Sequence, residues 1–84
     1  MDYASMGFIK AGKNRLRILE MLSAGFATQA EISHRLRMPE QLVSKALKEL
    51  EDREFAKAAA QKNQKGYTIT EKGLKIFRQV TQKG

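Results

Sequence analysis

The residues of this sequence best suited to chemistry lie at helical spacing between positions 41 and 48. Gln41, Ser44, Lys45 and Lys48 recur at steps of three and four residues, and side chains at such steps share one face of a helix. A glutamine amide can form two hydrogen bonds with adenine, a lysine ammonium can donate to guanine, and a serine hydroxyl can contact a base or a phosphate. These residues therefore have the chemistry of hydrogen-bonded recognition of nucleic acid.

The sequence lacks the residue patterns that enzymes and metal sites need. It has no paired-carboxylate motif, no nucleophile with a suitably spaced base and no phosphate-binding glycine loop. Cysteine is absent and His34 is the only histidine, which leaves a metal ion without its usual ligands. We therefore expect no enzymatic activity, no cofactor or metal, and no small-molecule effector.

Charge is distributed unevenly along the 84 residues. Sixteen Lys and Arg against nine Asp and Glu give a formal charge of +7, which attracts polyanions. Most of the excess lies in residues 57–84, where seven basic residues accompany a single acidic one, Glu71. The absence of cysteine, of a long apolar run and of a signal peptide predicts one cytoplasmic domain over residues 1–84, with no membrane association.

Three helices are predicted before residue 53. Apolar residues at steps of three and four predict the first over 13–23. Thr28 and Glu31 have the spacing of a capping box, which predicts a short second helix over about 28–35. Proline fits the first position of the third, over about 39–52, because its missing N–H would be unpaired there. The inward positions expected on the second and third helices are Ala30, Ile32, Leu36, Val43, Ala46, Leu47 and Leu50.

A hairpin and a last helix follow. Residues 55–60 and 66–70 have the composition of strands, although alanines weaken the first, and residues 61–65 form a polar, basic loop between them. Thr70 can cap the final helix, whose inward positions are Leu74, Ile76, Phe77 and Val80. We expect the first dozen and the last three or four residues to be loosely held. The predicted fold is α+β, mainly α with a small β-hairpin, in the order helix, helix, turn, helix, hairpin, helix.

This order resembles a winged helix-turn-helix, and the residues resemble small archaeal transcriptional regulators of that type, broadly similar to the MarR and ArsR groups. The stretches that carry the resemblance are Phe8–Arg15 (FIKAGKNR), Leu42–Leu50 (LVSKALKEL) and Tyr67–Gly73 (YTITEKG). Such proteins usually have glycine after the second and third helices, where this chain has Arg37 and Glu54. Either these two residues adopt left-handed conformations or the turns differ.

The resemblance implies binding of double-stranded DNA, with the third helix in the major groove and the hairpin, or wing, at 61–66 on the backbone or minor groove. The acidic residues at 49–54 would be repelled by phosphates, so we expect the helix to enter by its N-terminal end. Lys48 is also explained by ordinary solvation of an outer helix face. The residues assigned to DNA are Gln41, Ser44, Lys45 and Lys48 on the helix, Thr28, Arg35 and Arg37 beside the turn, and Lys62, Asn63 and Lys65 on the wing.

We expect a transcriptional regulator that represses by occlusion and acts as a homodimer, because one small reading head gives limited specificity. Subunits would pair through the last helix or the apolar N-terminal residues Tyr3, Met6, Phe8 and Ile9, unless both simply complete one small core. Two other functions remain open. The domain can be a protein–protein interaction module of a larger assembly, with an incidental basic face, or it can bind RNA through shape and phosphate contacts.

Overall fold

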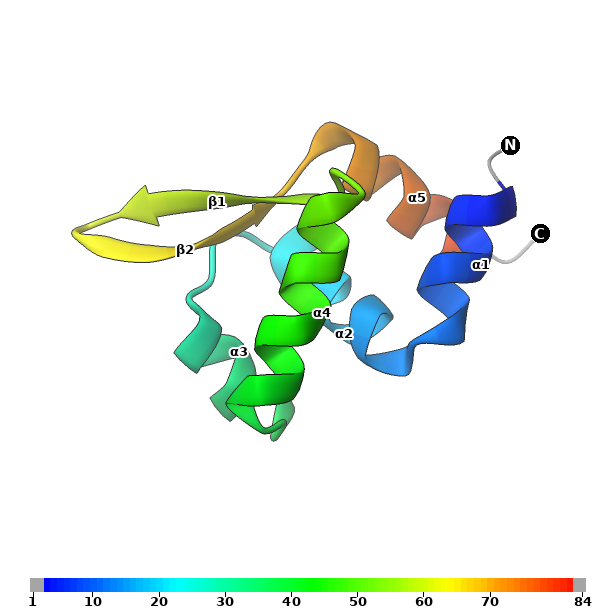
Figure 1. Ribbon diagram of the computed structural model, residues 1–84. Coiled ribbons are helices and arrows are strands. Elements are labelled where there is room, and N and C mark those ends of the chain that lie inside the picture. Colours follow the sequence, from blue (N-terminus) through cyan, green and yellow to red (C-terminus); the bar gives the residue numbers. More distant parts are fainter. Residues whose placement is uncertain (1–2, 83–84) are drawn as a thin grey trace.

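Five helices and one antiparallel hairpin make up residues 3–82, which the computed structural model describes (Figure 1). The four predicted helices and the hairpin are confirmed, and the fold is a winged helix of the α+β class. The elements in chain order are α1 (Tyr3–Ala11), α2 (Lys13–Ser23), α3 (Gln29–Leu36), α4 (Glu40–Asp52), β1 (Ala56–Gln61), β2 (Gln64–Ile69) and α5 (Glu71–Thr81).

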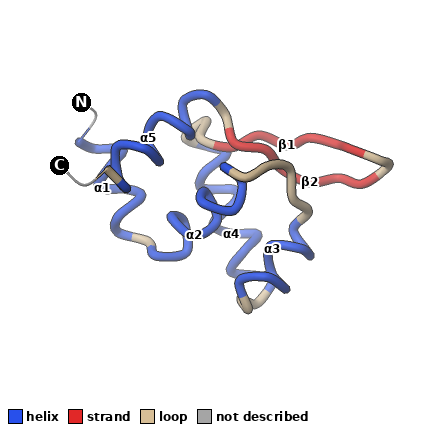
Figure 2. Tube along the Cα trace, turned by 180° about the vertical axis from the view of Figure 1, so that it is seen from behind, coloured by secondary structure: helices blue, strands red, loops and turns tan. Residues whose placement is uncertain are grey.

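The N-terminal segment is the main difference from the expected fold. The expectation that the first dozen residues are loosely held is wrong for residues 3–11, which form α1. Ser5 and Ile9, four residues apart, face inward, and Ile9 is fully buried. α1 and α5 lie side by side at the end of the molecule opposite the hairpin (Figures 1 and 2). Met1, Asp2, Lys83 and Gly84, for which loose attachment was also expected, lie outside the described residues.

One hydrophobic core joins the helices to the base of the hairpin. The expected inward stripe of α4 is buried, as are Phe55 and Ala56 where the chain enters β1. On α3, Ile32 is buried, but the expectation for Ala30 is wrong because its side chain is exposed. Two residues correspond to about 200° of helix rotation, so Ala30 and Ile32 cannot face the same neighbour. On α5, Ile76 is the most buried of the four apolar residues, and Leu74, Phe77 and Val80 are half-buried.

The turns after α3 and α4 contain the two residues that stand in place of glycine. Arg37 has φ 55° and ψ 47°, and Glu54 has φ 64°. Both therefore adopt the left-handed conformation that was one of the two expected alternatives. Pro39 directly precedes α4 with an extended ψ of 141°, so the helix begins one residue later than predicted.

The hairpin turn is shorter than predicted. Only Lys62 and Asn63 lie between the strands, and both have positive φ, 49° and 63°. Two successive left-handed residues match the twist of an antiparallel hairpin, so pairing extends to Gln61 and Gln64. The predicted loop at 61–65 is therefore wrong in length, although the hairpin itself is confirmed. Ala27 adds a bridge to Tyr67, with N–H···O distances of 3.1 and 2.9 Å, which attaches the segment before α3 to the wing.

Candidate nucleic-acid interface

The polar residues predicted on the third helix lie together on α4. Because Val43, Ala46, Leu47 and Leu50 hold one side of α4 in the core, the opposite side faces solvent. Gln41, Ser44, Lys45 and Lys48 are all exposed and line a shallow hollow of about 550 Å³ together with Glu40 and Gln29. We call these four residues the α4 stripe. Their amide, hydroxyl and ammonium groups are available to hydrogen-bond acceptors and donors of a ligand.

Gln29 connects the α4 stripe to the wing. Its side-chain nitrogen Nε2 donates to the backbone oxygen of Glu40 at 3.3 Å. It also lines a second hollow, of about 530 Å³, with Lys65, Gly66, Tyr67 and the alanines of β1. The two hollows therefore adjoin at Gln29 and form one continuous surface. Sequence reasoning missed this residue, although its place directly after the cap Thr28 marks it as the first residue of a helix.

The predicted wing residues do not all share this surface. Lys65 lines the hollow beside Gln29, whereas Lys62 and Asn63 form the turn at the tip of the hairpin, away from the helices (Figure 1). All three are exposed. A ligand that contacts both the α4 stripe and the hairpin turn must therefore be long enough to extend along the wing.

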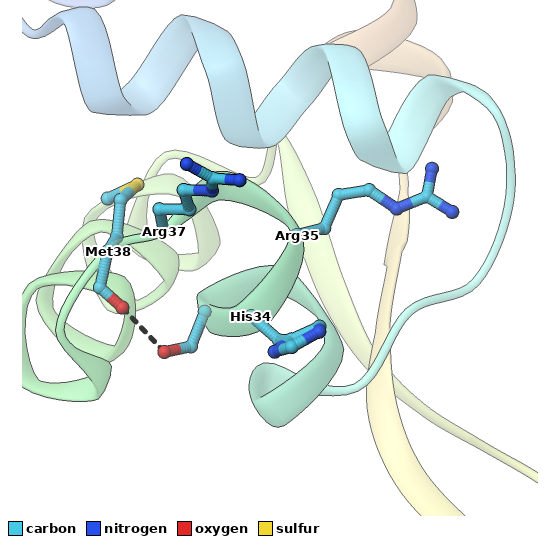
Figure 3. Close-up of a pocket in the computed structure, with 5 residues that line it drawn as sticks. His34, Arg35, Arg37 and Met38 are labelled. Carbon is cyan, nitrogen blue, oxygen red and sulfur yellow. Dashed lines mark hydrogen bonds between the residues drawn. The ribbon is translucent and has the colours of Figure 1, made fainter.

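The residues predicted beside the turn line a third hollow, of about 590 Å³. It is formed by Ser33, His34, Arg35, Arg37 and Met38, and the Ser33 hydroxyl donates to the Met38 carbonyl at 2.5 Å. Figure 3 shows that the side chains of Arg35 and Arg37 extend apart, while His34 points to another side. The two arginines are exposed but do not form a single clamp.

Thr28 is already engaged in the start of α3. Its hydroxyl oxygen accepts from the Glu31 N–H at 3.1 Å, and a Glu31 carboxylate oxygen accepts from the Thr28 N–H at 2.9 Å. This confirms the capping box. The hydrogen bond from the Thr28 backbone is the main reason that the pKa of Glu31 lies below its ordinary value. Only the hydroxyl proton of Thr28 remains for a ligand.

The comparisons with known proteins agree with this geometry. The winged helix-turn-helix family model matches residues 15–83. The chain belongs to the winged helix-turn-helix family. No curated protein sequence matches it.

Solved structures of ZitR from Lactococcus lactis are similar to this winged helix-turn-helix chain. A mutant in apo form has a TM-score of 0.76 and 26% identity, over 90% of this chain and 61% of that one. The structure described as a zinc-responsive MarR family member has a TM-score of 0.70 and 29% identity, over 77% and 47%. Wild-type ZitR in complex with DNA has a TM-score of 0.68 and 28% identity, over 77% and 47%. The resemblance to MarR-type regulators is thus confirmed as structural similarity, and the chain spans about half the length of the first of these structures.

The acidic end of α4 is tied to the rest of this winged helix-turn-helix domain by an ion pair that sequence reasoning missed. Arg15 contacts Glu49 with 2.9 Å between Nη2 and Oε2, and it also donates to the Phe8 carbonyl at 2.6 Å. The hydrogen bond from Arg15 is the main cause of the lowered pKa of Glu49. Glu51, Asp52 and Glu54 are exposed. α4 therefore has the expected polarity, with lysines toward its N-terminal half and carboxylates at its C-terminal end.

Two further searches of the described part of the chain give negative findings. Residues 3–82 contain no group of three or more His, Cys, Asp or Glu side chains placed to hold a metal ion. Within the same range, every helix is too short or too polar to cross a membrane.

Proposed function

We propose that this chain is a sequence-specific transcriptional regulator that binds double-stranded DNA. The observation that carries the proposal is the continuous exposed surface on which the α4 stripe and the wing adjoin at Gln29. A helix and a wing presented together are the parts that such a fold places in a groove and against the neighbouring backbone. The similarity to ZitR, whose structures include complexes with DNA, supports the same function.

In this proposal α4 enters the major groove by its N-terminal half. Gln41 would pair with adenine, and Lys45 would donate to base acceptors. Ser44 and Lys48 would contact base edges or phosphates from the same stripe. The carboxylates at the C-terminal end of α4 stay away from the phosphates, because like charges repel. The helix polarity thus selects the direction of entry.

The remaining cationic residues would contact the sugar–phosphate backbone. Lys62, Asn63 and Lys65 lie along the outer part of the wing, and Arg35 and Arg37 lie beside the turn between α3 and α4. Thr28 would donate its hydroxyl proton to a phosphate. Contacts of this kind supply affinity and register with little sequence information.

We further propose that the active species is a homodimer that represses by occlusion. One α4 contacts few base pairs, and two copies related by twofold symmetry would double the sequence read. The half-buried apolar residues of α5 and the exposed Tyr3 of the adjacent α1 support pairing at this end. Analytical ultracentrifugation with and without DNA tests the stoichiometry, and a monomer on every duplex would contradict this proposal.

The decisive experiment compares two variants that lose equal charge. In the first, Lys45, Lys62 and Lys65 are each replaced by Gln; in the second, Lys72, Lys75 and Arg78 of α5 are. Labelled random-sequence duplex DNA is titrated with each protein at several salt concentrations, with duplex RNA as competitor. We expect salt-sensitive binding that the first set largely removes and the second largely preserves.

Each other outcome has a clear meaning. Equal losses in both variants would indicate attraction by net charge alone and would contradict the proposed surface. Preference for duplex RNA would favour an RNA-binding role. An absence of binding to either nucleic acid at low salt would favour a protein–protein interaction module.

A further inference from the structure

Leu42 is an exposed apolar residue in the first turn of α4. Among the described residues, the only large hydrophobic side chains that are exposed are Leu42, at 46%, and Tyr3. A single apolar side chain on a surface is common, so its position decides whether it has a role. Leu42 directly follows Gln41 in the half of α4 that the proposed function places in the major groove.

The rotation of α4 places Leu42 at the border between the core and the α4 stripe. Each residue turns a helix by about 100°, so Leu42 lies one step from the buried Val43 and one step from Gln41. Residues three apart are neighbours on a helix surface, and Lys45 is three residues after Leu42. An apolar side chain and an ammonium group therefore lie next to each other at the edge of the stripe.

The hollow beside this pair has its other charges already used. It holds about 170 Å³ and is lined by Gly12, Asn14, Arg15, Leu42, Lys45, Ala46 and Glu49. Arg15 and Glu49 are bound to each other, and Arg15 also donates to the Phe8 carbonyl. The groups left for a ligand on α4 are thus the apolar surface of Leu42 and the ammonium of Lys45.

One base edge in the major groove carries the complementary pair of groups. Thymine presents the O4 acceptor beside its C5 methyl group, whereas cytosine presents an N4 donor and has no methyl group. An ammonium beside a leucine attracts the first edge and disfavours the second. A partner protein's apolar side chain would also fit Leu42, but it would leave the adjacent base-reading groups without acceptors.

We propose that Leu42 is a specificity-determining residue that contacts the methyl group of a thymine, while Lys45 donates to O4 of the same base. This inference rests on the proposed DNA-binding function and adds the identity of one base in the site. Burial of one methyl group corresponds to about a fourfold change in affinity.

The test uses the full chain and a duplex selected from a random library. Each thymine of the selected site is replaced in turn by uracil, which removes only the methyl group, and affinity is measured for the wild type and for Leu42→Ala. We expect one thymine per half-site at which the wild type loses about fourfold and Leu42→Ala loses nothing. Tyr3→Ala, which truncates the other exposed hydrophobic residue, serves as the control and keeps the discrimination.

A second replacement tests the lysine. With 5-methylcytosine in place of that thymine, the methyl group stays but the acceptor becomes a donor, so the wild type binds more weakly. Lys45→Ala is expected to reduce this difference while it keeps the preference for thymine over uracil. Circular dichroism confirms that each variant is folded.

The outcomes separate this inference from the proposed function. Binding with no effect of any thymine-to-uracil exchange, or with equal effects in wild type and Leu42→Ala, overturns the role of Leu42 and leaves DNA binding intact. A 5-methylcytosine penalty that Lys45→Ala does not reduce overturns the role of Lys45. No binding to any duplex overturns both the function and the inference.

Discussion

The Arg15 guanidinium of α2 and the Glu49 carboxylate of α4 form an ion pair with 2.9 Å between Nη2 and Oε2. The carbon at the centre of the same guanidinium lies 3.9 Å from the centre of the Phe8 ring, and that of Arg53 lies 4.2 Å from it. One side chain thus connects α1, α2 and α4. This connection fixes the C-terminal end of α4, while its N-terminal half remains exposed.

Replacement of Glu49 by Gln is expected to lower the free energy of unfolding at neutral pH by about 1 kcal/mol, the upper end for partly exposed ion pairs. Arg15 would keep its contacts with Phe8 but lose its charged partner. Urea denaturation of the wild type and Glu49→Gln measures the difference. Glu51→Gln, which removes an exposed carboxylate from the same helix, is the control and should have almost no effect.

The same pair predicts a dependence on pH. Because Arg15 lowers the pKa of Glu49 in the folded protein below the ordinary value of 4.5, the carboxylate stabilises the fold fully above the unfolded-state pKa. This contribution is lost as the pH falls through the folded-state pKa. The stability difference between wild type and Glu49→Gln should therefore shrink in acid. A difference of constant size below the lowered pKa would contradict the assignment.

Thr28→Ala is expected to destabilise the domain by about 1 kcal/mol, because it removes the side-chain acceptor of the Glu31 N–H at the start of α3. Thr28→Ser keeps the hydroxyl and should restore most of the loss. Chemical denaturation measures the stability, and hydrogen exchange of the Glu31 amide reports the cap directly. Equal stability of the two variants would show that the hydroxyl contributes little.

The elements with strong local signals could be predicted from the sequence. α2 has the predicted bounds because its apolar residues repeat at helical steps, and the capping box located the start of α3. α1 could not be predicted, because Gly7 lowers the helix propensity of a nine-residue segment. Its stability comes instead from contacts with distant residues, such as Arg15 on Phe8.

The candidate site was predictable only where it depends on one helix. The α4 stripe follows from periodicity within α4 and needs no other element. Gln29 joins this surface only because α3 packs against the start of α4, and Arg15 pairs with Glu49 across 34 positions of sequence. The short wing turn was missed because Lys62 and Asn63, rather than glycine, take positive φ.

Two glycines in helices should respond to alanine in opposite ways. A Cβ at Gly73 would collide with the backbone oxygen of Phe55, whereas a Cβ at Gly7 would meet no atom within 4 Å. Gly73→Ala is therefore expected to cost about 1–3 kcal/mol through overpacking. Gly7→Ala should stabilise the domain by about 0.5–1 kcal/mol, because alanine favours a helix interior. Thermal unfolding of both variants checks the signs, and a destabilised Gly7→Ala would contradict the packing of α1.

The left-handed turns allow stability to be separated from binding. Arg37→Gly and Glu54→Gly each replace a residue at positive φ, so each should stabilise the domain by about 1 kcal/mol. Only Arg37 is proposed to contact a phosphate, so Arg37→Gly should also weaken DNA binding while Glu54→Gly should not. Unfolding and binding assays on both proteins measure the two effects. Equal affinities of the two variants would remove Arg37 from the proposed interface.

The wing lysines should set the salt dependence of DNA binding. Each phosphate contact contributes about 0.9 to the slope of log affinity against log salt, so replacing both Lys62 and Lys65 by Gln should lower the slope by about 2. Sequence preference should not change, because backbone contacts carry little base information. Titrations at a series of salt concentrations give the slope, and Lys72→Gln with Lys75→Gln on α5 is the control of equal charge. An unchanged slope in the wing variant would place the wing off the backbone, whereas a changed sequence preference would indicate that it reads bases.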